Sequence, residues 1–224
     1  MIRTNLDFLN SSSNDASKVI MITSFNPGSG KTFISMNLAK VLSLKGKKVI
    51  VVDLDLRRAS MSRYLGSPVQ GITSYLSGKN IDLASLITKP SNEKAIDVLP
   101  VGALPPNPAE LLLNPLFDKI IAELKTKYDY ILLDCPPLGI VADTTISARV
   151  ADLTIFVIRA GVFDKSLIKD LEEVYNDGKL PHMSVILNGV DIAKSGYGYR
   201  YGYGYSSSDN GYINDYYNEV EKEK

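Results

Sequence analysis

Ser24-Phe25-Asn26-Pro27-Gly28-Ser29-Gly30-Lys31-Thr32 lies between an apolar run at residues 19–23 and a segment whose apolar residues recur at helical spacing. In a glycine-rich loop between a strand and a helix, backbone N–H groups turn towards phosphate oxygens, and the helix N-terminus adds partial positive charge. Lys31 would reach the β- and γ-phosphates, and the Thr32 hydroxyl would hold Mg²⁺. The loop therefore predicts ATP and Mg²⁺ as cofactors, with these nucleotide-binding residues: Asn26, Pro27, Gly28, Ser29, Gly30, Lys31, Thr32 and Phe33.

Six short apolar runs predict the strands of a sheet. Nearly every residue in them is apolar, which is typical of parallel strands covered by helices on both faces. Longer segments between the runs, such as residues 108–124, have apolar residues at helical spacing. The sequence therefore predicts an α/β fold with a doubly wound, mostly parallel sheet, whose ligands bind beyond the carboxyl ends of the strands. The predicted strands are residues 19–23, 49–53, 96–101, 130–134, 153–158 and 184–187.

Composition sets limits on the function. The 224 residues carry 25 basic and 25 acidic side chains, so we expect no nucleic-acid partner. One cysteine and one histidine exclude a disulfide framework, a cluster built on several cysteines and a histidine-rich metal site. The changes of composition along the chain predict three regions: an N-terminal segment at residues 1–17, which could be the end of a helix that starts outside this chain, a domain at 18–194 that holds the phosphate loop, and a disordered tyrosine-rich tail at 195–224.

Polar side chains end four of the predicted strands. Asp53 and Asp55 would repel each other unless a cation or a proton lay between them, so Mg²⁺ could bind there, or one of them could act as a base. A solvated pair in an ordinary turn also fits this pattern. Asp134 ends an apolar run as a Walker B carboxylate does. Arg159 and Asn188 are candidates for contact with the base or ribose, or ordinary loop residues.

These motifs resemble the bacterial tyrosine kinases (BY-kinases) of capsule and exopolysaccharide export. The phosphate loop resembles theirs in lacking the leading glycine, whose position Phe25 occupies. Asp53-Leu54-Asp55-Leu56-Arg57 is similar to the Walker A-prime box of the family, and Leu133-Asp134-Cys135-Pro136-Pro137 to its Walker B motif. Residues 104–112 are similar to its proline-bearing segment. The resemblance implies a P-loop NTPase of the Min/Par-like branch with protein-tyrosine kinase (transferase) activity.

The resemblance also implies roles for individual residues. Lys31, Asp53, Asp55 and Asp134 would be the catalytic residues. Asp53 would activate the tyrosine hydroxyl, while Thr32, Asp55 and Asp134 would support the metal ion.

Partners and location likewise follow from the resemblance alone. It implies a ring of subunits that phosphorylate one another's tails, a transmembrane activator or fused membrane region, and a tyrosine phosphatase. The chain would then work in the cytoplasm at the inner face of the plasma membrane. Arg3 resembles the last arginine of the family's oligomer-forming Glu-x-x-Arg-x-x-Arg motif, whose earlier residues would precede Met1, so we expect a fragment of a longer polypeptide.

The tail concentrates tyrosine. Of the 13 tyrosines in the chain, 8 lie between residues 197 and 217, several alternating with glycine. Exposed hydroxyls on a flexible segment can enter a neighbour's active site, and each added phosphate brings about −1.5 to −2 charges that loosen an oligomer by repulsion. An adhesive Gly/Tyr linker is the alternative. The predicted phosphoacceptors are Tyr197, Tyr199, Tyr201, Tyr203, Tyr205, Tyr212, Tyr216 and Tyr217.

Other functions remain open at this point. A Min/Par-type switch ATPase shares the loop but carries a second lysine where this chain has Asn26. An iron–sulfur carrier ATPase would need cluster cysteines, and Cys135 stands alone. A non-catalytic scaffold with an interaction tail is opposed only by the intact set of Lys31, Asp53 and Asp134, together with Asp55.

Overall fold

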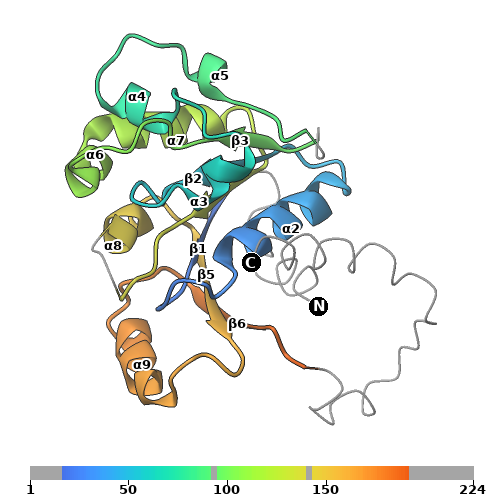
Figure 1. Ribbon diagram of the computed structural model, residues 1–224, viewed down its shortest axis with the longest axis vertical. Coiled ribbons are helices and arrows are strands. Elements are labelled where there is room, and N and C mark those ends of the chain that lie inside the picture. The colour runs from blue at the N-terminus through green and yellow to red at the C-terminus, as the bar shows by residue number, and fades with distance from the viewer. Residues whose placement is uncertain (1–16, 92–94, 140–142, 192–224) are drawn as a thin grey trace. The chain divides into compact units, whose positions relative to one another are not determined.

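Six parallel strands form the central sheet of the folded unit, which ends at Gly189 (Figure 1). The computed structural model describes residues 17–91, 95–139 and 143–191. The strand order is β3-β2-β4-β1-β5-β6. The strands are β1 (Lys18–Thr23), β2 (Val49–Asp53), β3 (Asp97–Leu99), β4 (Tyr130–Asp134), β5 (Leu153–Arg159) and β6 (Met183–Asn188).

Helices cover both faces of this sheet. On one face lie α2 (Lys31–Ser43) and α3 (Ser60–Tyr64), whose apolar side chains join one core cluster. The remaining helices contribute to the core of the opposite face. They are α4 (Ile72–Leu76), α5 (Leu83–Leu86), α6 (Pro108–Leu113), α7 (Pro115–Lys125), α8 (Asp143–Ala148), the 3₁₀ turn η1 (Lys165–Leu167) and α9 (Ile168–Asn176).

Alternate side chains of each strand pack into different cores, one on each face of the sheet. In β1, Val19 and Met21 pack on the face of α7, whereas Ile20 and Ile22 pack on the face of α2. The same alternation holds in β2, β4 and β5, because successive residues of a strand point to opposite faces. Both faces are buried, so the central strands are apolar throughout, and the predicted doubly wound α/β fold is confirmed.

Two local predictions differ from the structure. The third strand was predicted over residues 96–101 but covers Asp97–Leu99, because the carbonyl groups of Pro100 and Val101 accept hydrogen bonds from the first turn of α4 instead. The helical pattern of residues 108–124 forms two helices rather than one. Asn114 is extended, its side chain accepts a hydrogen bond from the N–H of Leu116, and Pro115 begins α7 without an N–H to continue the ladder.

The two ends of the chain fall outside this description. Residues 1–16 and 192–224 are not among the described residues, so Arg3, the predicted tail tyrosines and the predicted domain boundaries stay predictions. Within the part of the chain that the structure describes, no helix has the length and apolar character needed to cross a bilayer.

The strand order brings three loops together. Strand β4 lies between β2 and β1, with Asp134 paired in register with Asp53 on one side and with Ile22 on the other. The residues that follow these strands therefore leave the sheet at one edge, side by side. Open parallel sheets bind their ligands at this carboxyl edge.

Candidate nucleotide-binding site

The loop between β1 and α2 has the backbone of a phosphate cradle. Gly28 and Gly30 take left-handed conformations, with φ of +73° and +92°, and Gly30 is the residue that precedes α2. The hydroxyls of Ser24 and Ser29 both donate hydrogen bonds to the carbonyl oxygen of Asn26, at 2.7 and 2.9 Å. These bonds join residues within the loop. The loop leads directly into the N-terminus of α2, where an anion is favoured.

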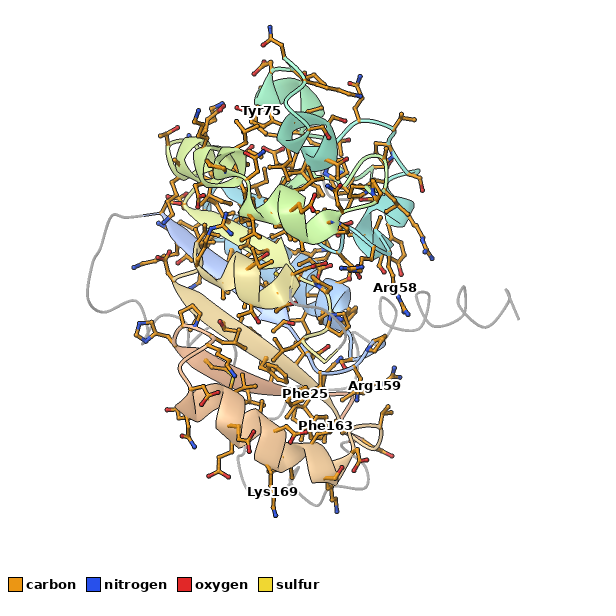
Figure 2. The ribbon with its side chains drawn as sticks, turned by 90° about the vertical axis from the view of Figure 1, so that its left-hand side faces the viewer. Phe25, Arg58, Tyr75, Arg159, Phe163 and Lys169 are labelled. Carbon is orange, nitrogen blue, oxygen red and sulfur yellow. The ribbon has the colours of Figure 1, made fainter. Side chains whose placement is uncertain are left out.

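Phe25 replaces a glycine because its ring is part of the core. The ring packs edge-on against Phe156 of β5, with 5.1 Å between centroids, and stacks on Phe163 at 6.1 Å. Figure 2 shows Phe25 and Phe163 lying together, near Arg159. The aromatic contacts anchor the start of the phosphate loop to the sheet.

Lys31 points back along the loop. The residue is 9% exposed, and its Nζ donates a hydrogen bond to Ser24 Oγ at 3.3 Å. Burial lowers the pKa of this amine, while the carboxylates of Asp134 and Asp55 act in the opposite direction. A desolvated ammonium beside carboxylates is suited to meet the negative charge of a phosphate.

Asp134 is held by two hydroxyls of α2. Thr32 Oγ1 donates to Asp134 Oδ2 at 2.7 Å, and Ser35 Oγ lies 3.3 Å from Oδ1. Burial raises the pKa of Asp134 to about 6, although the hydrogen bond from Thr32 and the charge of Lys31 oppose the shift. The predicted metal-binding pair of Thr32 and Asp134 is therefore in direct contact.

Asp53 is fully buried next to Asp134. Burial, and then the charge of Asp134, raise its pKa to about 7, against the hydrogen bonds that it accepts from Ser62 and from the N–H of Asp55. Two buried carboxylates at the ends of paired strands make this edge strongly favourable for a cation or a proton.

Asp55 lies in a turn rather than in a strand. The sequence predicted that Asp53 and Asp55 would point the same way if the strand continued, but β2 ends at Asp53. Asp55 is nevertheless buried, and its Oδ1 accepts a hydrogen bond from the N–H of Arg58 at 3.1 Å. Its charge acts on Lys31 and Asp134, so it belongs to the same cluster.

Arg57 connects this turn to α8. Its Nε and Nη2 donate to the two carboxylate oxygens of Asp143, at 2.9 and 3.3 Å. Arg57 is partly exposed while Asp143 is buried, so the ion pair satisfies a buried carboxylate whose charge would otherwise be costly.

Arg159 and Asn188 contact the loop itself. They end the adjacent strands β5 and β6, in register with each other. Arg159 Nη1 donates to the carbonyl of Gly28 at 2.9 Å, and Asn188 Nδ2 donates to the carbonyl of Ser29 at 3.1 Å. Their predicted contact with base or ribose remains a prediction. Phe33 lies on the first turn of α2 with half of its surface exposed.

Sequence reasoning missed three members of the site. Ser35 lies three residues after Thr32 on the same helix face, and that spacing could have identified it. Ser62 and Asp143 reach the site from short helices that no motif marks. Only the three-dimensional arrangement shows that they bind Asp53 and Arg57.

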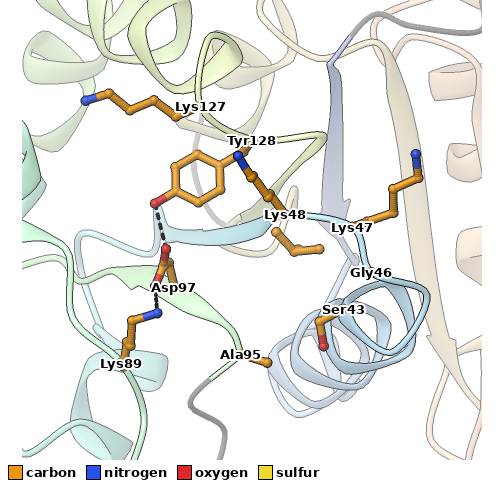
Figure 3. Close-up of a pocket in the computed structure, with 10 residues that line it drawn as sticks. Ser43, Gly46, Lys47, Lys48, Lys89, Ala95, Asp97, Lys127 and Tyr128 are labelled. Atoms are coloured by element: carbon orange, nitrogen blue, oxygen red, sulfur yellow. Dashed lines mark hydrogen bonds and ion pairs between the residues drawn. The ribbon is translucent and has the colours of Figure 1, made fainter.

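A separate surface pocket lies away from this site. Its volume is about 440 Å³, and it opens at the other edge of the sheet, where the chain enters β2, β3 and β4 (Figure 3). Lys47, Lys48, Lys89, Lys127 and Tyr128 are among the residues that line it. Its carboxylate, Asp97, already accepts a hydrogen bond from Tyr128 and pairs with Lys89. None of the predicted site residues lies there.

The donor set at the carboxyl edge fits Mg²⁺. Hard cations prefer carboxylate and hydroxyl oxygens, and Mg²⁺ usually takes one or two carboxylates while waters and substrate phosphates complete its shell. The Thr32 hydroxyl touches Asp134, and Asp55 lies in the same cluster. No group of three acidic, histidine or cysteine side chains suited to a metal occurs within the described ranges, so an ion here would need phosphate oxygens as well.

Comparisons with known proteins agree with this geometry. A family model described as "AAA domain" matches residues 17–177. The tyrosine-protein kinase CpsD of Streptococcus agalactiae serotype III is 36% identical over 199 residues, which cover 88% of this chain and 83% of that protein. The tyrosine-protein kinase YwqD of Bacillus subtilis is 38% identical over 200 residues, with the same coverage of each chain.

Solved structures give the same result. The kinase domain of the Escherichia coli tyrosine kinase ETK superposes with a TM-score of 0.75 at 30% identity, covering 92% of this chain and 77% of that one. The septum site-determining protein MinD of Pyrococcus horikoshii, solved with Mg-ADP, superposes with a TM-score of 0.60 at 27% identity, covering 76% and 70%. A phosphate loop joined to paired buried aspartates, in a chain this similar to CpsD, YwqD and ETK, places the protein in the family of bacterial tyrosine-protein kinases.

Proposed function

We propose that this chain uses Mg·ATP to phosphorylate tyrosines in the tail of a neighbouring subunit. The observation that carries the proposal is the meeting of Lys31, Asp53, Asp55 and Asp134 at one edge of the sheet, in a chain that ends with a cluster of tyrosines. The ring of subunits, the membrane-linked activator at the inner face of the plasma membrane, the opposing phosphatase and a role in capsule or exopolysaccharide export belong to the same proposal.

The phosphate loop and Lys31 bind the phosphates of ATP in this proposal. Thr32, Asp55 and Asp134 are the residues that would hold Mg²⁺, which when bound neutralises charge on the transferred phosphoryl group. MinD, a structural neighbour, was solved with Mg-ADP, which supports the use of a magnesium nucleotide. Arg159 and Asn188 keep the loop in place through its carbonyls.

Asp53 is the proposed base. The tyrosine oxygen forms a bond to the γ-phosphorus, the bond from that phosphorus to the β–γ bridging oxygen breaks, and ADP leaves. The phenolic proton, with an ordinary pKa of about 10, passes to Asp53. A carboxylate whose pKa is raised to about 7 is a stronger base than an exposed one, so it suits this transfer.

Intact mass after incubation with Mg·ATP tests the proposal. We expect successive additions of one phosphate, each about 80 Da, that map to the tyrosines between residues 197 and 217. The Lys31→Met variant should gain none, because the charge that meets the phosphates is lost. Lys40→Met, the same exchange further along α2 on an exposed residue, is the matched control and should keep the activity.

The other outcomes assign other functions. ATP hydrolysis without any gain of mass would support a switch ATPase of the Min/Par type. ATP bound but neither hydrolysed nor transferred, even with the membrane-linked activator present, would support a scaffold.

A further inference from the structure

Ser62 contacts Asp53 through two donors. It lies in α3, 2% exposed. Its backbone N–H donates to Asp53 Oδ2 at 3.0 Å, and its hydroxyl donates to the same oxygen at 2.8 Å. One carboxylate oxygen of Asp53 is therefore fully engaged by a single residue nine positions along the chain.

The orientation of the Ser62 hydroxyl is fixed from its other side. The backbone N–H of Val101 donates to Ser62 Oγ at 2.9 Å. An N–H can only donate, so the single hydroxyl hydrogen of Ser62 must point to Asp53. Val101 itself is tied to α4 through its carbonyl, which accepts from the N–H and the hydroxyl of Thr73. The hydroxyl is thus linked to α4 as well as to Asp53.

The second oxygen of Asp53 is less occupied. Oδ1 accepts one longer hydrogen bond, from the N–H of Asp55 at 3.2 Å. A carboxylate oxygen can accept about two hydrogen bonds, so Oδ1 keeps capacity that Oδ2 has used. Asp134 lies beside Asp53 in the sheet and its charge repels that of Asp53, so the contacts with Ser62 hold the Asp53 carboxylate against this repulsion.

We propose that Ser62 is a positioning residue, which fixes Oδ2 of Asp53 so that Oδ1 is presented to the tyrosine hydroxyl. The proposal rests on the kinase function proposed above. A purely structural role, in which Ser62 only ties α3 to the sheet, is the alternative. The two differ because positioning affects the transfer step and leaves ATP binding nearly unchanged, whereas loss of this buried hydroxyl lowers the stability of the fold in either case.

Three variants of the full chain test this role. Ser62→Ala removes the hydroxyl donor, Ser62→Cys keeps the size with a poor donor, and Ser62→Thr keeps the hydroxyl. Ser147→Ala is the matched control, because Ser147 is an equally buried serine whose hydroxyl bonds a helix carbonyl, that of Asp143. Each variant is measured for its rate of tyrosine phosphorylation at saturating Mg·ATP, its affinity for a fluorescent ATP analogue and its melting temperature.

We expect Ser62→Ala and Ser62→Cys to slow transfer by about 10- to 100-fold, the scale of a misplaced catalytic group. Affinity for the ATP analogue should stay within about twofold, and Ser62→Thr should regain most of the rate. Equal rates in Ser62→Cys and the wild type would overturn the proposal, as would parallel losses of rate, affinity and melting temperature or a similar loss in Ser147→Ala. Wild-type chain that transfers no phosphate with its membrane-linked activator present would instead overturn the kinase function, and this role with it.

Discussion

Asp53 and Asp134 are two described residues whose negative charge is costly to hold in the folded protein. Both are buried, and both have raised pKa values. The charge of Asp134 raises the pKa of Asp53, and the charge of Asp55 raises that of Asp134. A residue of this kind stores free energy in the unliganded site, because its ionised form is more stable in the unfolded chain than in the folded one. A bound cation releases that cost.

Stability should therefore depend on pH. The folded pKa of Asp53 is about 7 against a reference of 3.8, so the folded state holds a proton more tightly than the unfolded state does. Unfolding then becomes easier as the pH rises from about 4 to 7, and the dependence ends above that window. From Asp53 alone we expect the unliganded chain to lose about 2 kcal/mol between pH 5.5 and 8.

Urea unfolding at the two pH values measures this loss, with Asp53→Asn as the test variant. The variant should lose less stability than the wild type over this interval. Asp170→Asn, on the exposed surface of α9, should behave as the wild type does. An unchanged pH dependence in Asp53→Asn would show that Asp53 ionises normally.

At the residue scale, the sequence predicted which charged residues form the site but not which residues hold them in place by hydrogen bonds. Lys31, Thr32 and Asp134 stand in local motifs, and a motif can be read along the chain. Ser62 lies nine residues from Asp53 and Val101 a further 39, and nothing local marks them as partners. Their contact depends on how the short helices fold back over the sheet.

At the scale of the element, the phosphate loop depends on Gly30. The residue has φ of +92°, and a Cβ built there would collide with the amide of Asn188. Gly46, in the turn after α2, has φ of +75° but open space around it. The two glycines therefore separate backbone strain from steric collision.

We expect Gly46→Ala to cost about 1 kcal/mol of stability through strain alone and to leave ATP affinity unchanged. Gly30→Ala should cost more and abolish ATP binding, because the loop and Asn188 cannot both keep their places. Adding Asn188→Ala to Gly30→Ala should recover part of the stability. Urea unfolding and titration of a fluorescent ATP analogue measure both effects; equal costs for the two glycines would contradict the collision.

Secondary structure was predictable where apolar pattern and length agreed. The predicted central strands coincide with the observed ones to within one residue, because a parallel strand between two helix layers must be apolar throughout. The break between α6 and α7 was missed, since the apolar period continues across Asn114 while the backbone does not. The spacing of apolar residues indicates which face of a helical segment is buried, but it does not indicate whether the segment forms one helix or two.

At the scale of the whole molecule, the proposed catalytic residues and the predicted acceptor tyrosines lie in separate parts of the sequence. Both core clusters are built from residues between Val19 and Ile186. A chain ending at residue 194 should therefore unfold at the same urea concentration as the full chain and bind ATP with the same affinity. It should incorporate no phosphate itself, because the predicted acceptor tyrosines are gone.

Mixing experiments complete this test. Full-length Lys31→Met chain, inactive but with its tail intact, should gain phosphate when the truncated active chain is added. Phosphate on the truncated chain itself would place the acceptors outside the tail, and a Lys31→Met chain that stays unmodified in the mixture would contradict transfer between subunits.

The aromatic anchor at Phe25 has a consequence for the thermodynamics of ligand capture. A loop already packed on Phe156 and Phe163 has little conformational freedom left to lose when ATP arrives. The Phe25→Gly exchange would complete the G-x-x-x-x-G-K-[ST] pattern, yet it should weaken affinity and make the binding entropy less favourable in calorimetry. The Phe25→Gly variant would thus match the full phosphate-loop pattern and yet bind ATP more weakly than the natural chain.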